Sequence, residues 1–579
     1  MPKCLNARVL IPGIAQGELV ASNVPLSFWG GVDAKSGTII DNHHPLVGRS
    51  IAGKILMIPS GRGSCTGSGV ILELLLNGSH PSAMIFGREE MILTIGVLIA
   101  QEIFQKSIPV VQVSSSVFED LLRHDRMWID RGRICLEQPD DVSPIIPSES
   151  PSLHGSEFSS IQVSSLDREF LDGVHGRAVQ VAMRVILRMA QIQGVTELID
   201  VTQAHIDCCI YTGPATLKFA RQLHDWGARV RIPTSLNSIS IDQRLWRAQG
   251  VDPDLGEPSE QLAQAYVGMG AQPTFTCAPY LLETAPKRGE NVIWAESNAV
   301  VFANSVLGAR SIKCPDFLDV CVALTGRSLK TGCHLTANRK ARVQVHLEPC
   351  NGTDDSLYPL LGYLVGDIAA DRIPIVTGLE AAAPSIDDLK AFGAAFATTS
   401  SAAMFHIAGV TIEARTDEEI RWHLTDTNKV DISRSDLATQ YTLFNAPAVE
   451  EFTPIDLVSL GNPHFSHDEI IRLLSLCAGR TKSLNTALVI TCNRDTYSRA
   501  AKEGHIRALE EFGAQIITDT CWCMIQEPII PVDCQIILTN SAKYAHYGRG
   551  LTGRQVRFGG LTRCVDAACA GGISNQQYK

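Results

Sequence analysis

The chain has 579 residues, a formal net charge of −11 at pH 7 and a hydrophobic fraction of 45%. This length corresponds to roughly four domain-sized units, and the apolar content is enough for several buried cores. The acidic balance, without a dense run of Lys or Arg, argues against a nucleic-acid partner. The longest clean apolar run, Met91 to Ala100, is about half of a membrane span, so we expect no membrane segment.

The N-terminal residues lack the basic start, apolar middle and small-residue cleavage site of a signal peptide, so we expect a cytoplasmic protein. In a reducing compartment the 17 cysteines are expected to be core residues, metal ligands or catalytic thiols rather than a disulfide framework. Because free cysteine is among the most buried residue types, only a few of them require a chemical explanation.

Residues 1–136 alternate short β-rich runs with one strong helical pattern, which predicts a compact α/β unit. The strands are expected at 8–12, 53–59, 82–87 and 109–113, and the helix at 91–105. Residues 137–160 are acidic, rich in Pro and Ser and without sustained periodicity, which is typical of an interdomain linker.

Residues 161–579 change to long helical patterns between short buried strands, which favours parallel α/β layers. A helix is expected at 174–194, and strands at 197–201, 229–234 and 487–492. The region is too long for one hydrophobic core, so two or three subdomains are expected. The predicted fold class is α/β: a small β/α unit joined by a linker to a large multi-subdomain α/β region.

The stretch "GRGSCTGSGVI", residues 61–71, lies between an apolar strand and an apolar helix. It lacks the Lys of a Walker loop, the last Gly or Ala of a dinucleotide fingerprint, and the paired glycines of a nucleophile elbow. Its backbone N–H groups at a helix start favour a carboxylate ligand. The Gly and Ser content equally suits a tight turn and a helix N-cap, and the local sequence leaves both interpretations open.

Several polar clusters follow in the larger region. Residues 274–311 contain a density of neutral hydrogen-bonding groups that suits the orientation of a small polar substrate. Further clusters occur at 460–466, 516–523 and 539–550, and the second of these places Cys521 at the end of a predicted strand. The "CWC" spacing, with one intervening residue, is weak evidence for a metal site.

The stretches "GRGSCTGS", "TCAPYL", "WAESNAVVFANSVLGAR", "TANR", "FHIAGVTIEA", "GNPHFS", "DTC" and "SAKYAHY", in this order, resemble aconitase X, a divergent branch of the aconitase superfamily. The resemblance covers nearly the whole chain. It implies an aconitase-superfamily-like fold in which a small swivel domain supplies a catalytic serine to the site. The fusion of small and large parts resembles members that act as cis-3-hydroxy-L-proline dehydratases, whereas separate subunits resemble mevalonate 5-phosphate dehydratases.

The resemblance implies that Ser64 removes a proton next to the substrate carboxylate. Helix N–H groups together with Arg62 or Lys543 are the candidates to stabilise its alkoxide. Glu296, His205 and Asp207 are candidate acceptors for a ring ammonium, and the last two also suit a satisfied core pair. No Arg/Lys fork for a phosphate is evident, which favours a small amino acid substrate. The full set of substrate-binding candidates is Gly63, Cys65, Thr66, His205, Asp207, Glu296, Ser297, Asn298 and Arg310.

The family also implies an iron or iron–sulfur centre held by cysteines, and Cys277 and Cys521 match its pattern. Where some members have Gly-Cys-Pro-His, this chain has Asn462, which offers an amide oxygen instead. A missing thiolate favours a two-iron cluster or mononuclear iron over a three-cysteine cubane. The alternative third ligands are Cys350, Cys492 and Cys65. The alternative functions are a mevalonate 5-phosphate dehydratase and a non-catalytic iron-binding or RNA-binding relative, and the oligomeric state is open.

Overall fold

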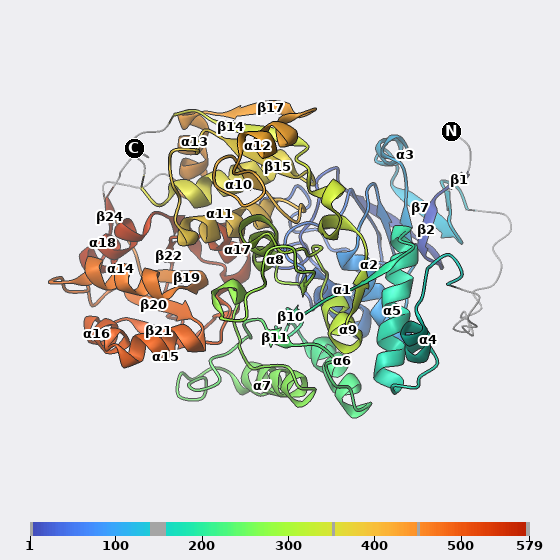
Figure 1. Ribbon diagram of the computed structural model, residues 1–579, viewed down its shortest axis with the longest axis horizontal. Coiled ribbons are helices and arrows are strands. Elements are labelled where there is room, and N and C mark those ends of the chain that lie inside the picture. Colours follow the sequence, from blue (N-terminus) through green and yellow to red (C-terminus); the bar gives the residue numbers. More distant parts are fainter. Residues whose placement is uncertain (1–3, 139–157, 350–353, 448–451, 575–579) are drawn as a thin grey trace.

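The computed structural model describes residues 4–138, 158–349, 354–447 and 452–574, which form a mixed α/β molecule (Figure 1). A sheet-rich N-terminal unit is followed by a larger α/β region with several sheets, as the predicted fold class requires. Most of the predicted linker, residues 139–157, lies outside the described residues. Across the described ranges, no helix combines the length and the apolar character that a membrane crossing demands.

The N-terminal unit is built on an eight-stranded sheet with the order β1-β8-β7-β3-β4-β5-β6-β2. The strands β3, β4, β5 and β6 are parallel to one another, and the outer pairings are antiparallel. The predicted strands and helix of this unit are confirmed. The elements are β1 (Cys4–Asn6), β2 (Arg8–Ile11), β3 (Ile14–Ala21), β4 (Ile55–Ile58), α1 (Gly67–Asn77), β5 (Ala83–Phe86), α2 (Ile92–Phe104), β6 (Val110–Gln112), α3 (Ser115–Leu121), β7 (Arg126–Asp130) and β8 (Arg133–Cys135).

One cysteine pair corrects the expectation that all cysteines are reduced. Cys4 and Cys135 form a disulfide, because they stand directly opposite each other on the antiparallel strands β1 and β8. Cross-strand neighbours bring their Cβ atoms within reach of a disulfide. The cysteines of the larger region that the structure describes are free.

The next part of the chain packs helices around two small sheets. In one of them β10 lies between β11 and β12, and all three strands are parallel. The predicted strand at 229–234 is wrong, because the strand begins only at Thr234. Pro233 immediately before it has no N–H to donate. The elements are α4 (Ser165–Leu171), α5 (Arg177–Gln193), β9 (Leu198–Asp200), β10 (Ala204–Ile206), α6 (Pro214–Asp225), β11 (Thr234–Leu236), α7 (Pro253–Gly268), β12 (Ile293–Trp294), α8 (Ser297–Phe302), α9 (Leu318–Thr325) and β13 (Arg327–Leu329).

Two parallel sheets and a short antiparallel pair, β18 (Phe452–Pro454) with β24 (Gly572–Ser574), form the remainder. The two parallel sheets confirm the parallel α/β layers predicted for the larger region. Their orders are β16-β15-β14-β17 and β21-β20-β19-β22-β23. The first lies at the top of Figure 1 and the second at its left. Their elements include β14 (Val343–Leu347), α10 (Leu357–Ala369), β15 (Pro374–Thr377), α11 (Ile386–Thr399), β16 (His406–Ile407), α12 (Asp417–Leu424), β17 (Asn428–Ile432), α13 (Arg434–Phe444), β19 (Leu457–Phe465), α14 (His467–Cys477), β20 (Ala487–Cys492), α15 (Arg494–Lys502), α16 (His505–Phe512), β21 (Gln515–Thr518), β22 (Ile536–Thr539), α17 (Ala542–Thr552), β23 (Gln555–Phe558) and α18 (Leu561–Ala570).

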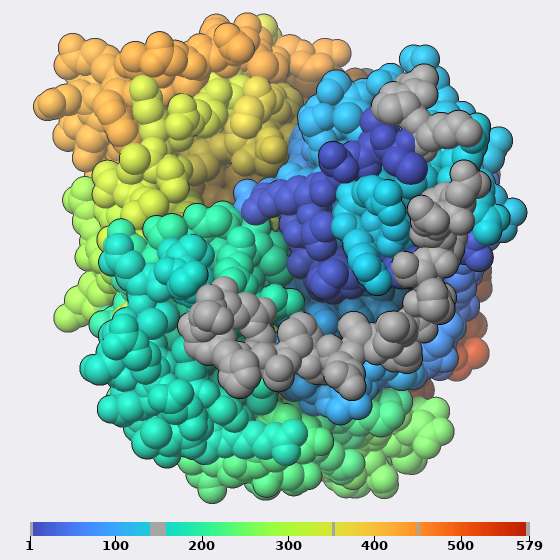
Figure 2. Space-filling view, turned by 90° about the vertical axis from the view of Figure 1, so that its right-hand side faces the viewer, coloured from blue at the N-terminus to red at the C-terminus, as the bar shows by residue number. Residues whose placement is uncertain are grey.

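The N-terminal unit, blue in Figure 2, is seated against the larger region. Helix α1 packs on α6, and the carboxylate of Glu73 accepts a hydrogen bond of 2.7 Å from the N–H of Ala215 at the start of α6. A Cβ added to Gly69 would lie 3.2 Å from side-chain atoms of Thr212 and Thr216, so the small residue permits this close approach. One buried apolar cluster runs through both parts. This contact brings the loop before α1 against the larger region.

Candidate active site

The serine loop, residues 61–67, connects β4 to the first turn of α1, as the strand-loop-helix pattern predicts. Ser64 Oγ donates a hydrogen bond to Thr66 Oγ1 at 3.1 Å, and the N–H of Thr66 points back to Ser64 Oγ at 3.3 Å. Thr66 Oγ1 in turn donates to Asp207 Oδ2 of the larger region at 3.3 Å. The two hydroxyls therefore form a buried chain that crosses between the two parts of the molecule.

Two further residues of the serine loop have defined structural tasks. Gly63 has φ +76°, and a Cβ there would lie 2.5 Å from the hydroxyl oxygen of Tyr547. Only glycine tolerates both the backbone conformation and this approach. The guanidinium of Arg62 lies 3.0 Å from Asp41, a carboxylate of its own unit. The charge of Arg62 is thus already compensated beside the loop.

Asp207 follows β10 and lies within a group of buried acids. Its Oδ1 accepts a hydrogen bond from the amide of Asn237, and its own N–H donates to Asp319 at 2.8 Å. Burial, together with the nearby carboxylates of Glu296 and Asp319, raises the pKa of Asp207 well above its usual value. A carboxyl with a raised pKa at the end of a hydroxyl chain is suited to receive a proton.

Glu296 is the N-cap of α8 and contacts two polar side chains, those of Lys543 and Asn298. It lies 3.0 Å from the ammonium of Lys543 and accepts a hydrogen bond of 2.7 Å from the amide of Asn298. Burial would raise the pKa of Glu296, but Lys543 and Asn298 together hold it below its usual value. Ser297 is buried beside them as the first residue of the helix. The predicted residues Glu296, Asn298 and Lys543 therefore form one charged, hydrogen-bonded group.

Three buried thiols lie near this group. Cys277 precedes a short 3-10 turn, while Cys521 and Cys523 follow β21. Cys523 accepts a hydrogen bond from the thiol of Cys521, which lowers the pKa of Cys523, and the ammonium of Lys543 acts in the same direction. The pKa of Lys543 is itself raised above its usual value by Glu296 and these thiols, although burial opposes this.

These thiols fit an iron–sulfur centre by the chemistry of their surroundings. The backbone N–H of His464 points to Cys277 Sγ at 3.3 Å, and the amide of Asn462 donates to Cys523 Sγ at 3.4 Å. N–H groups aimed at cysteine sulfurs, with a cation nearby, are the arrangement that stabilises thiolates bound to iron. Asn462 therefore lies beside Cys523 with its amide N–H toward the sulfur, and its role as an oxygen ligand stays a prediction.

Some predicted residues lie elsewhere or have other partners. Arg310 donates to the carbonyl of His334 and to the hydroxyl of Thr336, each at 2.9 Å, so its guanidinium is engaged away from the serine loop. His205 is buried with its Nδ1 2.8 Å from Ser235 Oγ, whereas Asp207 bonds to Asn237 and Thr66, so the two residues do not form the satisfied core pair considered from the sequence. Of the alternative third ligands, Cys65 is buried in the serine loop, Cys492 lies at the end of β20, and Cys350 lies outside the described residues.

Sequence reasoning missed four residues of this neighbourhood. Cys523 was discounted because a Cys-x-Cys spacing is a weak metal signal, although its adjacency to Cys521 was visible. The others are in one short segment: Asp316 and Asp319 face Asp207, and Lys313 lies near Cys65. Charged residues inside an otherwise apolar stretch were the available signal. Burial lowers the pKa of Lys313, whose ammonium donates to the carbonyl of Ser400 at 2.8 Å.

Comparison with protein families places all of these residues in matched segments. The model of the aconitase X swivel domain matches residues 4–137. The models of the aconitase X first, second and third domains match residues 160–337, 340–442 and 455–570.

Curated relatives match over almost the full chain. A cis-3-hydroxy-L-proline dehydratase of Hypocrea jecorina is 55% identical, covering 97% of this chain and 94% of the relative. Another of Pseudomonas aeruginosa is 48% identical, covering 97% and 96%. The phosphomevalonate dehydratase large subunit of Methanothermobacter thermautotrophicus is 32% identical and covers 68% of this chain and 95% of its own. The crystal structure of Thermococcus kodakaraensis aconitase X in its holo-form aligns with a TM-score of 0.63 at 29% identity, covering 70% of this chain and 100% of that one.

Proposed function

Because the chain belongs to the aconitase X family, we propose that it is a cis-3-hydroxy-L-proline dehydratase, a hydro-lyase that forms Δ1-pyrroline-2-carboxylate and water. The observation that carries this proposal is the high identity to two such dehydratases over 97% of the chain. The match to a phosphomevalonate dehydratase subunit is weaker and shorter, and supports the runner-up function less.

Dehydration requires a base for the proton next to the carboxylate, and Ser64 is the proposed base. An isolated hydroxyl is too weak a base for this step. The chain from Ser64 through Thr66 to Asp207 offers a route for the serine proton, and the N–H of Thr66 stabilises the negative charge left on Oγ. Asp207, with its raised pKa, is the proposed acceptor at the end of this route.

The substrate carboxylate requires a cationic side chain that is not already paired with a carboxylate of the protein. Arg62 pairs with Asp41 and Lys543 pairs with Glu296. Among the residues that the structure describes, Lys313 makes no ion pair and donates only to the carbonyl of Ser400. We therefore propose that Lys313, near Cys65 of the serine loop, binds the substrate carboxylate. Asn298 and Glu296 are the groups proposed to orient the ring ammonium.

Cys277, Cys521 and Cys523 are the residues proposed to hold an iron–sulfur centre, which when bound supplies a Lewis acid for the departing hydroxyl. Within the described ranges, their sulfurs are not all within 4.8 Å of one another. Thiolates on a single ion, with metal–sulfur bonds of about 2.3 Å, would lie closer together. This spread favours a two-iron cluster over mononuclear iron.

The test is a coupled assay on anaerobically purified protein with iron and sulfide quantified per chain. We expect turnover of cis-3-hydroxy-L-proline, followed through reduction of Δ1-pyrroline-2-carboxylate by an added reductase, and no turnover of mevalonate 5-phosphate. Turnover of mevalonate 5-phosphate alone would establish the runner-up function. Folded, iron-loaded protein without either activity would instead favour a non-catalytic iron-binding relative.

A further inference from the structure

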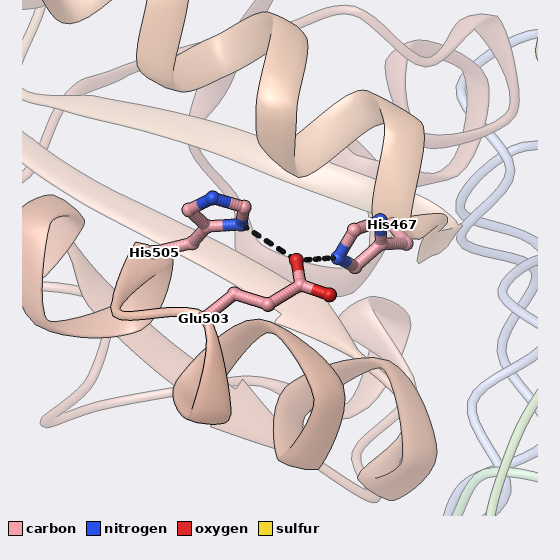
Figure 3. A group of neighbouring side chains, drawn as sticks. All are labelled: His467, Glu503 and His505. Atoms are coloured by element: carbon pink, nitrogen blue, oxygen red, sulfur yellow. Dashed lines mark hydrogen bonds and ion pairs between the residues drawn. The ribbon is translucent and has the colours of Figure 1, made fainter.

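A second group of metal-binding side chains lies outside the candidate active site, in the C-terminal part of the chain (Figure 3). His467 is the first residue of α14, and Glu503 and His505 flank the turn between α15 and α16. Gly504 between them has φ +81°, which allows the tight turn that puts both side chains on the same side. Two segments more than thirty residues apart in the sequence thus place three potential metal-ligand atoms close together.

One nitrogen of each histidine lies close to the same carboxylate oxygen of Glu503. Glu503 Oε2 lies 2.6 Å from His467 Nε2 and 3.3 Å from His505 Nδ1, and the three atoms are all within 4.8 Å of one another. Tetrahedral ligands with bonds of about 2.0–2.2 Å are about 3.3 Å apart. The His505 distance already has this value, and the His467 distance requires a small outward shift. Glu503, at the exposed end of α15, has the freedom to make that shift.

The surroundings orient the carboxylate and leave the site accessible. Arg499, one helical turn before Glu503, lies 3.4 Å from Oε1, the other carboxylate oxygen, so that Oε2 faces the histidines. His467 also lines a cavity of about 620 Å³ that Arg499, Asp468 and Thr496 share. Glu503 and His505 do not line this cavity, but their side chains are 40% and 28% exposed, so an ion reaches them from solvent. Three protein ligands would leave a fourth position for water.

We propose that His467, Glu503 and His505 form a binding site for a divalent transition-metal ion of the zinc class. Two imidazoles and a carboxylate suit zinc, and they disfavour Mg²⁺ and Ca²⁺, which prefer all-oxygen ligands. An ion there ties the start of α14 to the α15–α16 turn. The site is separate from the proposed thiol-bound centre and from the serine loop.

The chain contains a matched control for this site. His175 Nε2 lies 3.0 Å from Glu169 Oε2, a histidine–glutamate pair similar to that of His467 and Glu503, and no second histidine accompanies it among the described residues that could hold an ion. If a single pair were enough to bind zinc, both places would bind it equally. If three donors are needed, only the His467 group will bind tightly.

The experiment uses the iron-loaded full chain and measures bound zinc by equilibrium dialysis against ZnSO₄, with metal analysis of the protein. The variants are His505→Gln, Glu503→Gln and the control His175→Ala. We expect one more tightly bound zinc ion per chain in wild type and in His175→Ala than in the other two variants, whose affinity falls at least about tenfold. Turnover without added zinc should be unchanged in all of them.

Two outcomes would overturn the proposal. In the first, wild type and the His505→Gln and Glu503→Gln variants bind the same number of zinc ions with the same affinity. In the second, His175→Ala loses as much zinc as they do, which would reveal binding to scattered surface histidines. Because any zinc at the active-site cysteines is common to all variants, only the difference between variants counts. Melting temperatures without zinc identify a variant that fails to fold, and the remaining variant then decides.

Discussion

The functional residues of the serine loop lie in one continuous segment, residues 61–67. The three cysteines of the proposed iron–sulfur centre, here called the thiol group, are far apart in the sequence, at positions 277, 521 and 523. The loop is shaped by local rules: a strand ends, a glycine with positive φ turns the chain, and a helix begins. The thiol group exists only because β19, β20 and β21 are paired in one parallel sheet whose ends meet the turn that carries Cys277. One half of the site is therefore local and the other depends on tertiary structure.

This difference governs how each half should respond to mutation. A change in the serine loop alters one hydrogen-bonded chain and leaves the sheets untouched. A change among the thiols removes a proposed ligand together with its N–H···S partner. We therefore expect loop variants to lose turnover while they retain iron, and thiol variants to lose iron and turnover together.

Ser64→Ala should have the largest effect on turnover. Removal of the proposed base is expected to lower kcat by about 10³-fold, while iron content and melting temperature remain those of the wild type. Anaerobic steady-state assays with cis-3-hydroxy-L-proline provide the measurement.

Ser68→Ala is the matched control for this variant. Ser68 is buried in the first turn of α1, four residues after Ser64, but its hydroxyl donates to the carbonyl of Cys65 and has no part in the chain to Asp207. Its kcat should remain within a few-fold of wild type. Near wild-type turnover in folded Ser64→Ala would remove Ser64 from the mechanism.

Cys523→Ser should have the next largest effect and is specific to the thiol half. Loss of this sulfur is expected to reduce iron content to less than half and kcat by about 10²-fold. Iron and acid-labile sulfide per chain, with the EPR spectrum, are the measurements. Cys492→Ser is the control, because Cys492 is fully buried on β20 and was also a candidate third ligand. If Cys492→Ser lost the iron and Cys523→Ser kept it, the ligand assignment would be wrong.

The contrast between local and tertiary determinants also explains which features could be predicted from the sequence and which could not. The strands and helix around Ser64 follow from alternating apolar runs, and the α/β class follows from their alternation along the chain. Asn462 was expected to contribute an oxygen, because its position matches a cysteine of other members and nothing local shows which way the amide faces. The Cys-x-Cys spacing of Cys523 is only a weak metal signal, and the contacts with Asn462 and Cys521 that support its proposed role arise only in the folded chain. The Cys4–Cys135 disulfide was missed for a similar reason, since strand register is not visible from two cysteines 131 residues apart.

Thr66→Val should have the smallest effect on turnover. It tests the hydrogen-bonded link between Ser64 of the N-terminal unit and Asp207 of the larger region. Valine keeps the shape of threonine but removes the hydroxyl that connects Ser64 to Asp207. The Thr66 side chain makes no capping hydrogen bond to α1, so its loss leaves the helix start intact. We expect kcat to fall about tenfold, or about 1.4 kcal/mol in the barrier, with KM unchanged.

Thr66→Ser retains a hydroxyl at the same position and should restore most of this turnover, which a purely structural role would not predict. The pH profile supplies a second readout. Because the pKa of Asp207 is raised, its carboxylate is lost on acidification at a higher pH than an ordinary aspartate, and wild-type kcat should fall there. In Thr66→Val the base is disconnected from Asp207, so that acid limb should weaken or disappear. An unchanged acid limb, with kcat equal in the valine and serine variants, would show that the hydroxyl chain carries no proton.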